Sequence, residues 1–113
     1  MSIAQTKVID FIRLNKENTK VYLTIADDWN WDLKGTDASM HLQFLQEKLN
    51  NYIAFIENGE IFSEYPEAKG KPLEIEIYFK TSPSVNCIKF LDLAKKKIEN
   101  EVKVGFNWKL HKN

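Results

Sequence analysis

The residues best suited to chemistry lie in one short acidic and aromatic segment. Residues 27–32 follow directly on an apolar run and comprise Asp27, Asp28, Trp29, Asn30, Trp31 and Asp32. Segments held at the ends of rigid elements often carry binding or catalytic groups. A carboxylate here, paired with His41, could act as an acid–base couple. Tryptophans rimmed by carboxylates favour instead an interface for a basic protein partner.

Each of these groups also has a purely structural interpretation. Trp29 and Trp31 can fold back over the end of the core, as large amphipathic side chains often do. His41 can be a solvent-facing or hydrogen-bonded residue, because no Ser, Cys or second His stands at a spacing that indicates a nucleophile beside it. The residue types alone leave both interpretations open.

The spacing of the oxygen-bearing side chains matches the first part of a calcium-binding loop. Asp28, Asn30 and Asp32 match its first, third and fifth positions. Leu33 stands where that loop needs glycine, and Ser39 where it needs a bidentate glutamate. We therefore expect no metal site and no cofactor. The ligands to test for a metal would be Asp27, Asp28, Asp32 and His41.

The charge balance disfavours polyanionic partners. The 113 residues include 16 Lys and Arg and 16 Asp and Glu, so the net charge is zero. Nucleic acid and anionic membranes call for a basic footprint that this balance lacks. Arg13 is the sole arginine, and the run Lys95, Lys96 and Lys97 is typical of a solvated helix face. We expect neither nucleic acid nor membrane as a partner.

The chain has the marks of a single domain over residues 1–113. Cys87 is the only cysteine, and its surroundings predict a buried, unreactive thiol. The first residues lack the regions of a signal peptide, and no apolar run approaches the roughly 20 residues that span a bilayer. These features predict a cytoplasmic protein.

Hydrophobic periodicity predicts the elements that position these residues. Alternation over residues 8–14 and 21–25, around a polar stretch, predicts an antiparallel hairpin. Apolar residues at steps of three and four predict a long helix from Asp37, its N-cap, to Asn58. Gly59 can end this helix in the left-handed conformation.

Strand and helix alternate again in the second half. Residues 60–72 have no period and are expected to form an ordered loop, with Ile61, Phe62 and Tyr65 turned inwards. A half-buried strand is expected at residues 73–79, then a helix started by Ser82 and Pro83. The apolar stripe of that helix comprises Cys87, Ile88, Leu91, Ala94 and Ile98. Strict alternation predicts a last strand over residues 102–110.

The order β-β-α-β-α-β, with one apolar face on each element, predicts an α+β fold. We expect a two-layer sandwich, in which a four-stranded mixed sheet carries two helices on one face and its last two strands run parallel. The polar outer face would then hold Glu74, Glu76, Tyr78, Lys103, Asn107 and Lys109.

Several strings of the sequence are similar to one known family. They are residues 23–28, 31–32, 41–50, 55–61 and 65–71. Over nearly its whole length the chain resembles a family of small bacterial proteins catalogued as a domain of unknown function. This resemblance implies a bacterial cytosolic single-domain protein and carries no catalytic residue over. The matching loop adds a second candidate surface with Glu60, Tyr65, Lys69 and Gly70.

Two functions from different classes are expected from these features. The first is a non-enzymatic protein-interaction module, of an accessory or immunity type, that binds a protein partner or itself, for example as a homodimer. It would use Trp29, Trp31 and the nearby acids, and it requires outward, contiguous indoles. The alternative is a small enzyme or small-ligand binder. It requires Asp27, Asp28 and His41 to converge in a pocket of a few hundred Å³ at the start of the long helix.

Overall fold

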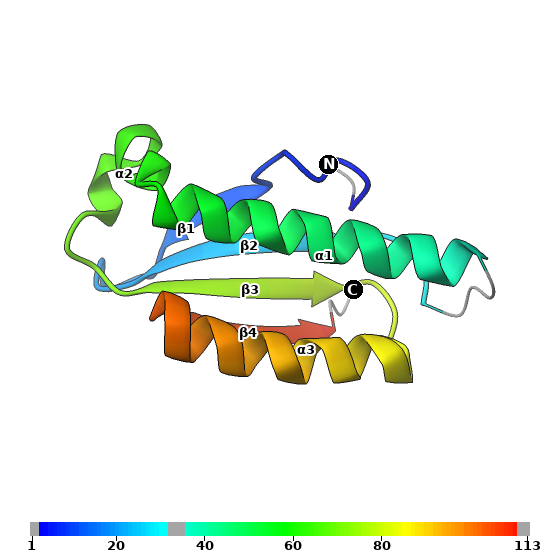
Figure 1. Cartoon of the computed structure of the whole chain (residues 1–113). Helices are drawn as coiled ribbons and strands as arrows, with labels where there is room; N and C mark the ends of the chain where they lie inside the picture. Colours follow the sequence, from blue (N-terminus) through cyan, green and yellow to red (C-terminus); the bar gives the residue numbers. More distant parts are fainter. Residues whose placement is uncertain (1–2, 32–35, 111–113) are drawn as a thin grey trace.

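The fold is a four-stranded sheet with two long helices on one face (Figure 1). The computed structural model describes residues 3–31 and 36–110, and all of their side chains except those of residues 36 and 37. Its strands are β1 (Phe11–Leu14), β2 (Val21–Asp27), β3 (Leu73–Phe79) and β4 (Gly105–Leu110). Its helical elements are α1 (Thr36–Glu57), α2 (Glu60–Glu64), the 3-10 turn η1 (Pro66–Ala68), α3 (Val85–Lys97) and the π-helical turn η2 (Ile98–Val102). The predicted α+β class and element order are confirmed.

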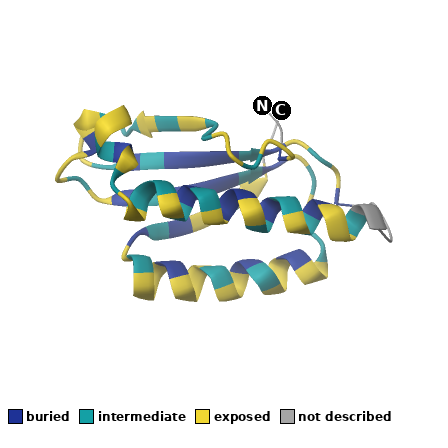
Figure 2. Cartoon of the chain, turned by 45° about the horizontal axis from the view of Figure 1, so that its top comes forward, coloured by how far each residue is buried: buried dark blue, intermediate teal, exposed yellow. Residues whose placement is uncertain are grey.

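The strands lie in the sheet in the order in which they occur in the chain, β1-β2-β3-β4. β1 runs antiparallel to β2, with Phe11 opposite Thr24. β2 and β3 are parallel, as are β3 and β4, so the predicted parallel pairing of the last two strands is confirmed. The two central strands are mostly buried, whereas β1 at one edge, beside α2, is exposed or half-exposed throughout (Figure 2).

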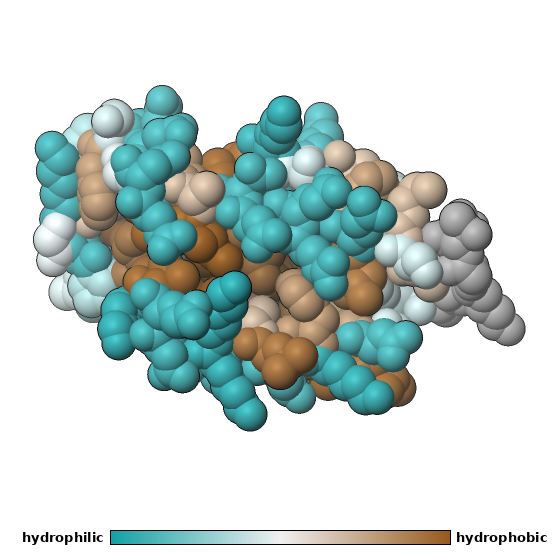
Figure 3. Space-filling view, viewed as in Figure 1, coloured by the Kyte–Doolittle hydropathy of each residue, from teal (hydrophilic) through white to brown (hydrophobic). Residues whose placement is uncertain are grey.

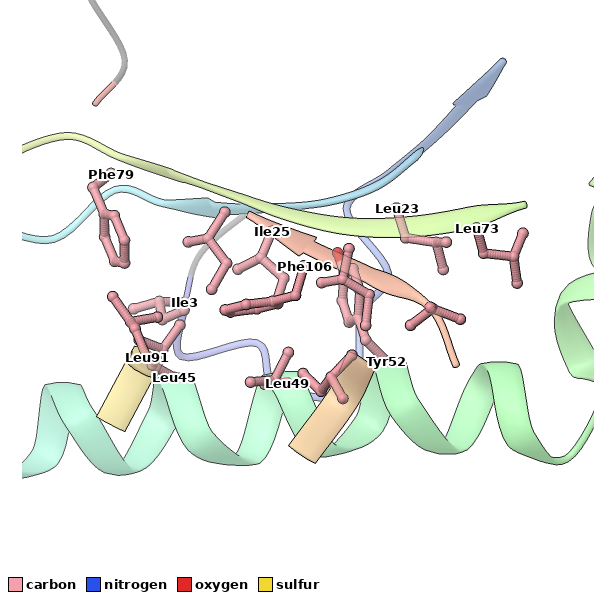
Figure 4. Close-up of a cluster of buried hydrophobic side chains, with 14 of the residues drawn as sticks. Ile3, Leu23, Ile25, Leu45, Leu49, Tyr52, Leu73, Phe79, Leu91 and Phe106 are labelled. Atoms are coloured by element: carbon pink, nitrogen blue, oxygen red, sulfur yellow. The ribbon is translucent and has the colours of Figure 1, made fainter. Parts of the chain in front are cut away.

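The core fills the space between the helices and the inner face of the sheet (Figure 4). Alternate strand residues point into it, and the helices add their apolar stripes. Fully or almost fully buried members are Leu23, Ile25, Leu45, Leu49, Tyr52, Ile75, Ile77, Leu91 and Phe106. No helix among the described residues is both long enough and apolar enough to cross a membrane.

The first strand begins at Phe11 and not at residue 8 as predicted. Polar groups replace the strand ladder just before it. The Tyr52 hydroxyl accepts a hydrogen bond from the Asp10 N–H (2.7 Å) and donates one to the Thr24 carbonyl (2.5 Å). The Asp10 carboxylate accepts from the Ala26 N–H at 3.0 Å. Burial raises the pKa of Tyr52, so its hydroxyl keeps the proton that this bridge needs.

The region after α1 is more regular than the predicted loop. Gly59 has φ +81°, so the left-handed conformation predicted for it is confirmed. The next residues then form α2 and η1, two elements too short to show a hydrophobic period. Ile61 is fully buried, while Phe62 and Tyr65 pack against the core as partly buried residues.

The second long helix begins two residues later than predicted. Ser84, and not Ser82, is the N-cap: its side-chain oxygen accepts a hydrogen bond from the Cys87 N–H at 3.1 Å. Cys87, Leu91 and Ile98 are buried, but Ile88 is 38% exposed, so its assignment to the stripe was wrong.

Replacing Ser84 by alanine removes this cap. We expect the free energy of unfolding to fall by about 1 kcal/mol, because the Cys87 N–H loses its partner at the helix start. Urea denaturation measures the difference. Ser82→Ala is the matched control, since Ser82 is exposed and lies outside the helix; equal losses in the two variants would contradict the assignment of the cap.

The last strand also starts later than predicted, at Gly105. Val102 belongs to η2, and Lys103 ends that turn with φ +65°, its N–H donating to the Ile98 carbonyl at 3.0 Å. Lys103 is therefore not on the outer face of the sheet. Glu76 is on that face but is only 3% exposed.

Candidate functional site

Asp27 ends β2 and points to the inner face, in phase with Leu23 and Ile25. Its carboxylate is fully buried and has three donors. His41 Nε2 lies 2.8 Å from each of its oxygens, Trp31 Nε1 donates to Oδ2 at 3.2 Å, and the Trp29 N–H donates to Oδ1 at 3.2 Å. These contacts stabilise a charge that would otherwise be expensive to bury.

His41 is enclosed by the two predicted tryptophans. The Trp31 ring stacks on it with centroids 3.6 Å apart at 17°, and Trp29 meets it edge-on at 5.4 Å. The imidazole is 0% exposed. Its Nδ1 atom has no hydrogen-bond partner within the described part of the chain.

The cluster of Asp27, Trp29, Trp31 and His41 fixes the chain at the carboxyl end of β2. Trp31 is 6% exposed and Trp29 is partly buried, so the indoles do fold back over the core, as the structural interpretation predicted. The pair of Asp27 and His41 has the composition of an acid–base couple, yet it is sealed from solvent. In this geometry its effect is to hold Trp29 and Trp31 against His41 of α1.

The other predicted site residues lie elsewhere. Asp28 is exposed, and its Oδ1 accepts from the Ile3 N–H at 3.2 Å, so it does not converge with His41. Asp32 lies outside the described residues. The second candidate surface, Glu60, Tyr65, Lys69 and Gly70, follows the far end of α1. His41 lies 16 residues before Glu57, the last residue of α1, which is a rise of about 24 Å along the helix, so this surface is remote from His41.

A buried ion pair was missed by the sequence analysis. Lys48 on α1 and Asp10 both have fully buried side chains, with Nζ and Oδ1 2.7 Å apart. Lys48 Nζ also donates to the Gln5 carbonyl at 3.2 Å. The signal was present, since Lys48 stands between Leu45 and Tyr52 at helical spacing and so on the buried face of the helix.

The sheet face opposite the helices carries a further buried carboxylate, that of Glu76. Glu76 Oε1 accepts from Thr24 Oγ1 at 2.7 Å and from Arg13 Nη2 at 3.2 Å. Beside this pair lies a hollow of about 600 Å³, the open-face hollow. Its lining includes Phe11, Thr24, Ala26, Tyr78 and Lys80. This face therefore combines paired charges with accessible aromatic surface.

Two more hollows flank α1. One of about 600 Å³, the edge hollow, lies between β1, the outer flank of α1 and α2, and includes Phe11, Ile12, Phe55, Glu60 and Glu64. The other, of about 450 Å³, is an apolar groove between α1 and α3, seen as the brown strip in Figure 3. Its lining includes Ile53, Phe90 and Leu93. Within the described residues, no group of three or more His, Cys, Asp and Glu side chains could hold a metal ion.

Comparison with known families assigns the sequence to one of them. A model of a family of unknown function, DUF6572, matches residues 1–112. The chain belongs to this family. The match confirms the family resemblance seen in the sequence. No curated protein and no solved structure matches the chain.

The single thiol of this DUF6572 chain gives a direct test of core burial. Burial, followed by the negative charge of Asp27, raises the pKa of Cys87 to about 12. Because the thiolate is the reactive form, we expect iodoacetamide to leave Cys87 unmodified in native protein at neutral pH and to react rapidly after addition of urea. Mass spectrometry of the labelled chain measures this. Full labelling of the native protein within minutes would contradict burial of the thiol.

Proposed function

We propose that this chain is a non-enzymatic protein-interaction module whose binding surface lies around β1. The observation that carries the proposal is the position of Phe11. Its side chain is 47% exposed, and it borders both the open-face hollow and the edge hollow. Aromatic side chains beside pockets are typical anchors of protein interfaces.

The surroundings of Phe11 support a protein partner. Ala26 and Tyr78 extend the apolar surface on one side, and the aliphatic and aromatic side chains of Ile12 and Phe55 extend it on the other. The charge of Arg13 is already paired with Glu76, so of the cations that line this hollow Lys80 is the one with no ion pair seen among the described residues. Removing the apolar surface from water contributes roughly 25 cal/mol for each Å² buried.

This proposal moves the binding surface away from the two indoles. Trp31 is used inside the protein, where it packs on His41 and donates to Asp27. The alternative of a small enzyme needed Asp27, Asp28 and His41 to meet in one pocket. Asp27 and Asp28 both border the open-face hollow, whereas His41 borders none of the three hollows described above. Geometry therefore favours binding over acid–base chemistry.

The cellular location and the type of role belong to the same proposal. A bacterial cytosol, which the family resemblance implies, and an accessory or immunity-type role suit a small module that covers a site on another protein. Self-association through the same surface is the competing form of this function, and the oligomeric state in solution distinguishes the two.

The test compares Phe11→Ser with two other exposed apolar residues. Val85→Ser removes a side chain that is 70% exposed and borders none of the three hollows, and Leu93→Ser alters the groove between the helices. Proteins crosslinked to each tagged variant in source cells are quantified by mass spectrometry, and the best candidate is purified for calorimetry. We expect a partner bound by wild type and Val85→Ser with equal affinity, and at least tenfold more weakly by Phe11→Ser.

Two outcomes would overturn the proposal. Equal binding by Phe11→Ser and wild type would show that the β1 surface is not used. Selective loss in Leu93→Ser would place the partner in the groove between α1 and α3.

A further inference from the structure

The two edges of the sheet differ in whether other parts of the chain bond to their outward backbone groups. A free edge presents unpaired N–H and C=O groups to any chain that can add a strand. β4 and β1 are the two edge strands. Whether each edge is covered therefore decides where a strand could be added.

The edge at β4 is covered at Phe106 by a side chain of α3. Lys95 Nζ donates to the Phe106 carbonyl at 2.9 Å and pairs with Glu99 Oε2 at 2.8 Å. The hydrogen bond from Lys95 lowers the pKa of Glu99. Lys95 thus occupies the Phe106 carbonyl, in place of a neighbouring strand.

Among the residues that the structure describes, none covers the edge at β1 in this way. The Asn15 N–H donates to the Lys20 carbonyl at 2.9 Å, and Arg13 stands opposite Tyr22 in the ladder. Because hydrogen bonds alternate along an antiparallel strand, the N–H and C=O groups of Ile12 and Leu14 point away from β2. Within residues 3–31 and 36–110, no side chain or loop is seen to bond to these groups.

The edge hollow lies beside these free groups and sets the chemistry of an added strand. Its strand side includes Ile9 and Ile12, and its helix side Phe55, so it suits an aliphatic side chain. Glu60 and Glu64, both exposed, border it at the α2 end. The Asp10 charge in the same lining is paired with Lys48. Among the described lining residues, Lys7 is the one cation that opposes the two glutamates.

Building on the proposed function, we propose that an extended segment of a partner protein pairs with β1 at Ile12 and Leu14. Alternate side chains of that segment would place an aliphatic group in the edge hollow and a basic group near Glu60 and Glu64. Main-chain bonds supply affinity in such strand addition, and the alternate pockets supply selectivity. A second copy of β1 fits less well, because its basic residue, Arg13, points to the opposite face of the sheet from Ile12 and Leu14.

The experiment selects a phage-displayed library of random dodecapeptides on wild-type protein and measures the Kd of the enriched peptides on variants. Ile12→Pro removes one outward N–H while leaving the bonds to β2 in place, and proline is tolerated at such edge positions. Leu110→Pro is the matched control on the other edge strand. We expect peptides with alternating aliphatic and basic residues. We also expect Ile12→Pro to bind them at least tenfold more weakly than wild type does. The double variant Glu60→Gln/Glu64→Gln should bind them several-fold more weakly at low salt. Leu110→Pro should bind them with the wild-type Kd.

Hydrogen exchange on the wild-type protein keeps the proposal falsifiable if Ile12→Pro fails to fold. The Ile12 and Leu14 amides should exchange rapidly in the free chain and slowly with a selected peptide bound. Slow exchange in the free monomer would overturn the proposal, as would a dimer that Ile12→Pro dissociates. Peptides that Phe11→Ser loses but Ile12→Pro retains would overturn strand addition while leaving the protein-interaction function intact. Absence of any enriched peptide, together with unchanged crosslinking by Phe11→Ser, would overturn both.

Discussion

Replacing Lys48 by methionine is expected to lower the free energy of unfolding by about 3–5 kcal/mol, since breaking a buried ion pair leaves an uncompensated charge. The side chains of Lys48 and Asp10 are fully buried, and Lys48 Nζ lies 2.7 Å from Asp10 Oδ1. Methionine fills a similar volume, so the loss comes from the Asp10 carboxylate and not from a cavity. For a domain with the usual 5–15 kcal/mol of stability, this is a large fraction.

Urea denaturation at neutral pH measures the change. Lys96→Met is the control, because Lys96 is exposed on α3 and its replacement should alter stability by no more than about 0.5 kcal/mol. The double variant Asp10→Asn/Lys48→Met should recover much of the loss, since asparagine can still accept from the Ala26 N–H without a buried charge. A loss below about 1 kcal/mol in Lys48→Met would contradict the buried pair.

Replacing Asp27 by alanine should have an effect of similar size. The side chains of His41 and Trp31 and the Trp29 N–H all lose their acceptor at once. Each buried donor left unpaired costs about 1–3 kcal/mol, so for three donors we expect a total loss of at least about 3 kcal/mol. Asp27→Asn keeps one acceptor oxygen and should lose less.

The indoles report this change independently of stability. We expect the tryptophan emission of Asp27→Ala to shift to longer wavelength in the absence of urea, because Trp31 loses the contact that holds it in the core. Asp28→Ala is the neighbouring control, with an exposed side chain and one hydrogen bond, and should leave the emission unchanged. An unshifted spectrum together with wild-type stability in Asp27→Ala would show that the cluster does not anchor the indoles.

The elements most visible in the sequence were those with a sustained period. α1 was predicted to within one residue at each end, because its apolar stripe repeats over six turns and Gly59 stops it. α2 was missed, since five residues are too few to show a helical period. The start of α3 was misplaced, because Ser82 and Ser84 are both good caps and only the position of the Cys87 N–H decides between them.

Four of the predicted site residues lie together in the structure, but their burial was not predicted. The proximity of Asp27, Trp29, Trp31 and His41 follows from a strand that ends where a helix is about to begin. Their burial does not, because it depends on the side of the strand to which Asp27 points and on the reach of His41 from α1. The uncovered edge of β1 could not be predicted from the sequence. It depends on which side chains reach each edge of the sheet, as Lys95 reaches β4.

The order of the strands in the sheet has a consequence for how the chain assembles during synthesis. Because the spatial order β1-β2-β3-β4 repeats the chain order, each new strand joins the outer side of the strand made just before it. No strand has to enter between two that are already paired, and no pairing has to open again. Translation can therefore extend the sheet in one direction, with each crossover helix folding onto strands that precede it, and β4 closes the core as the final step.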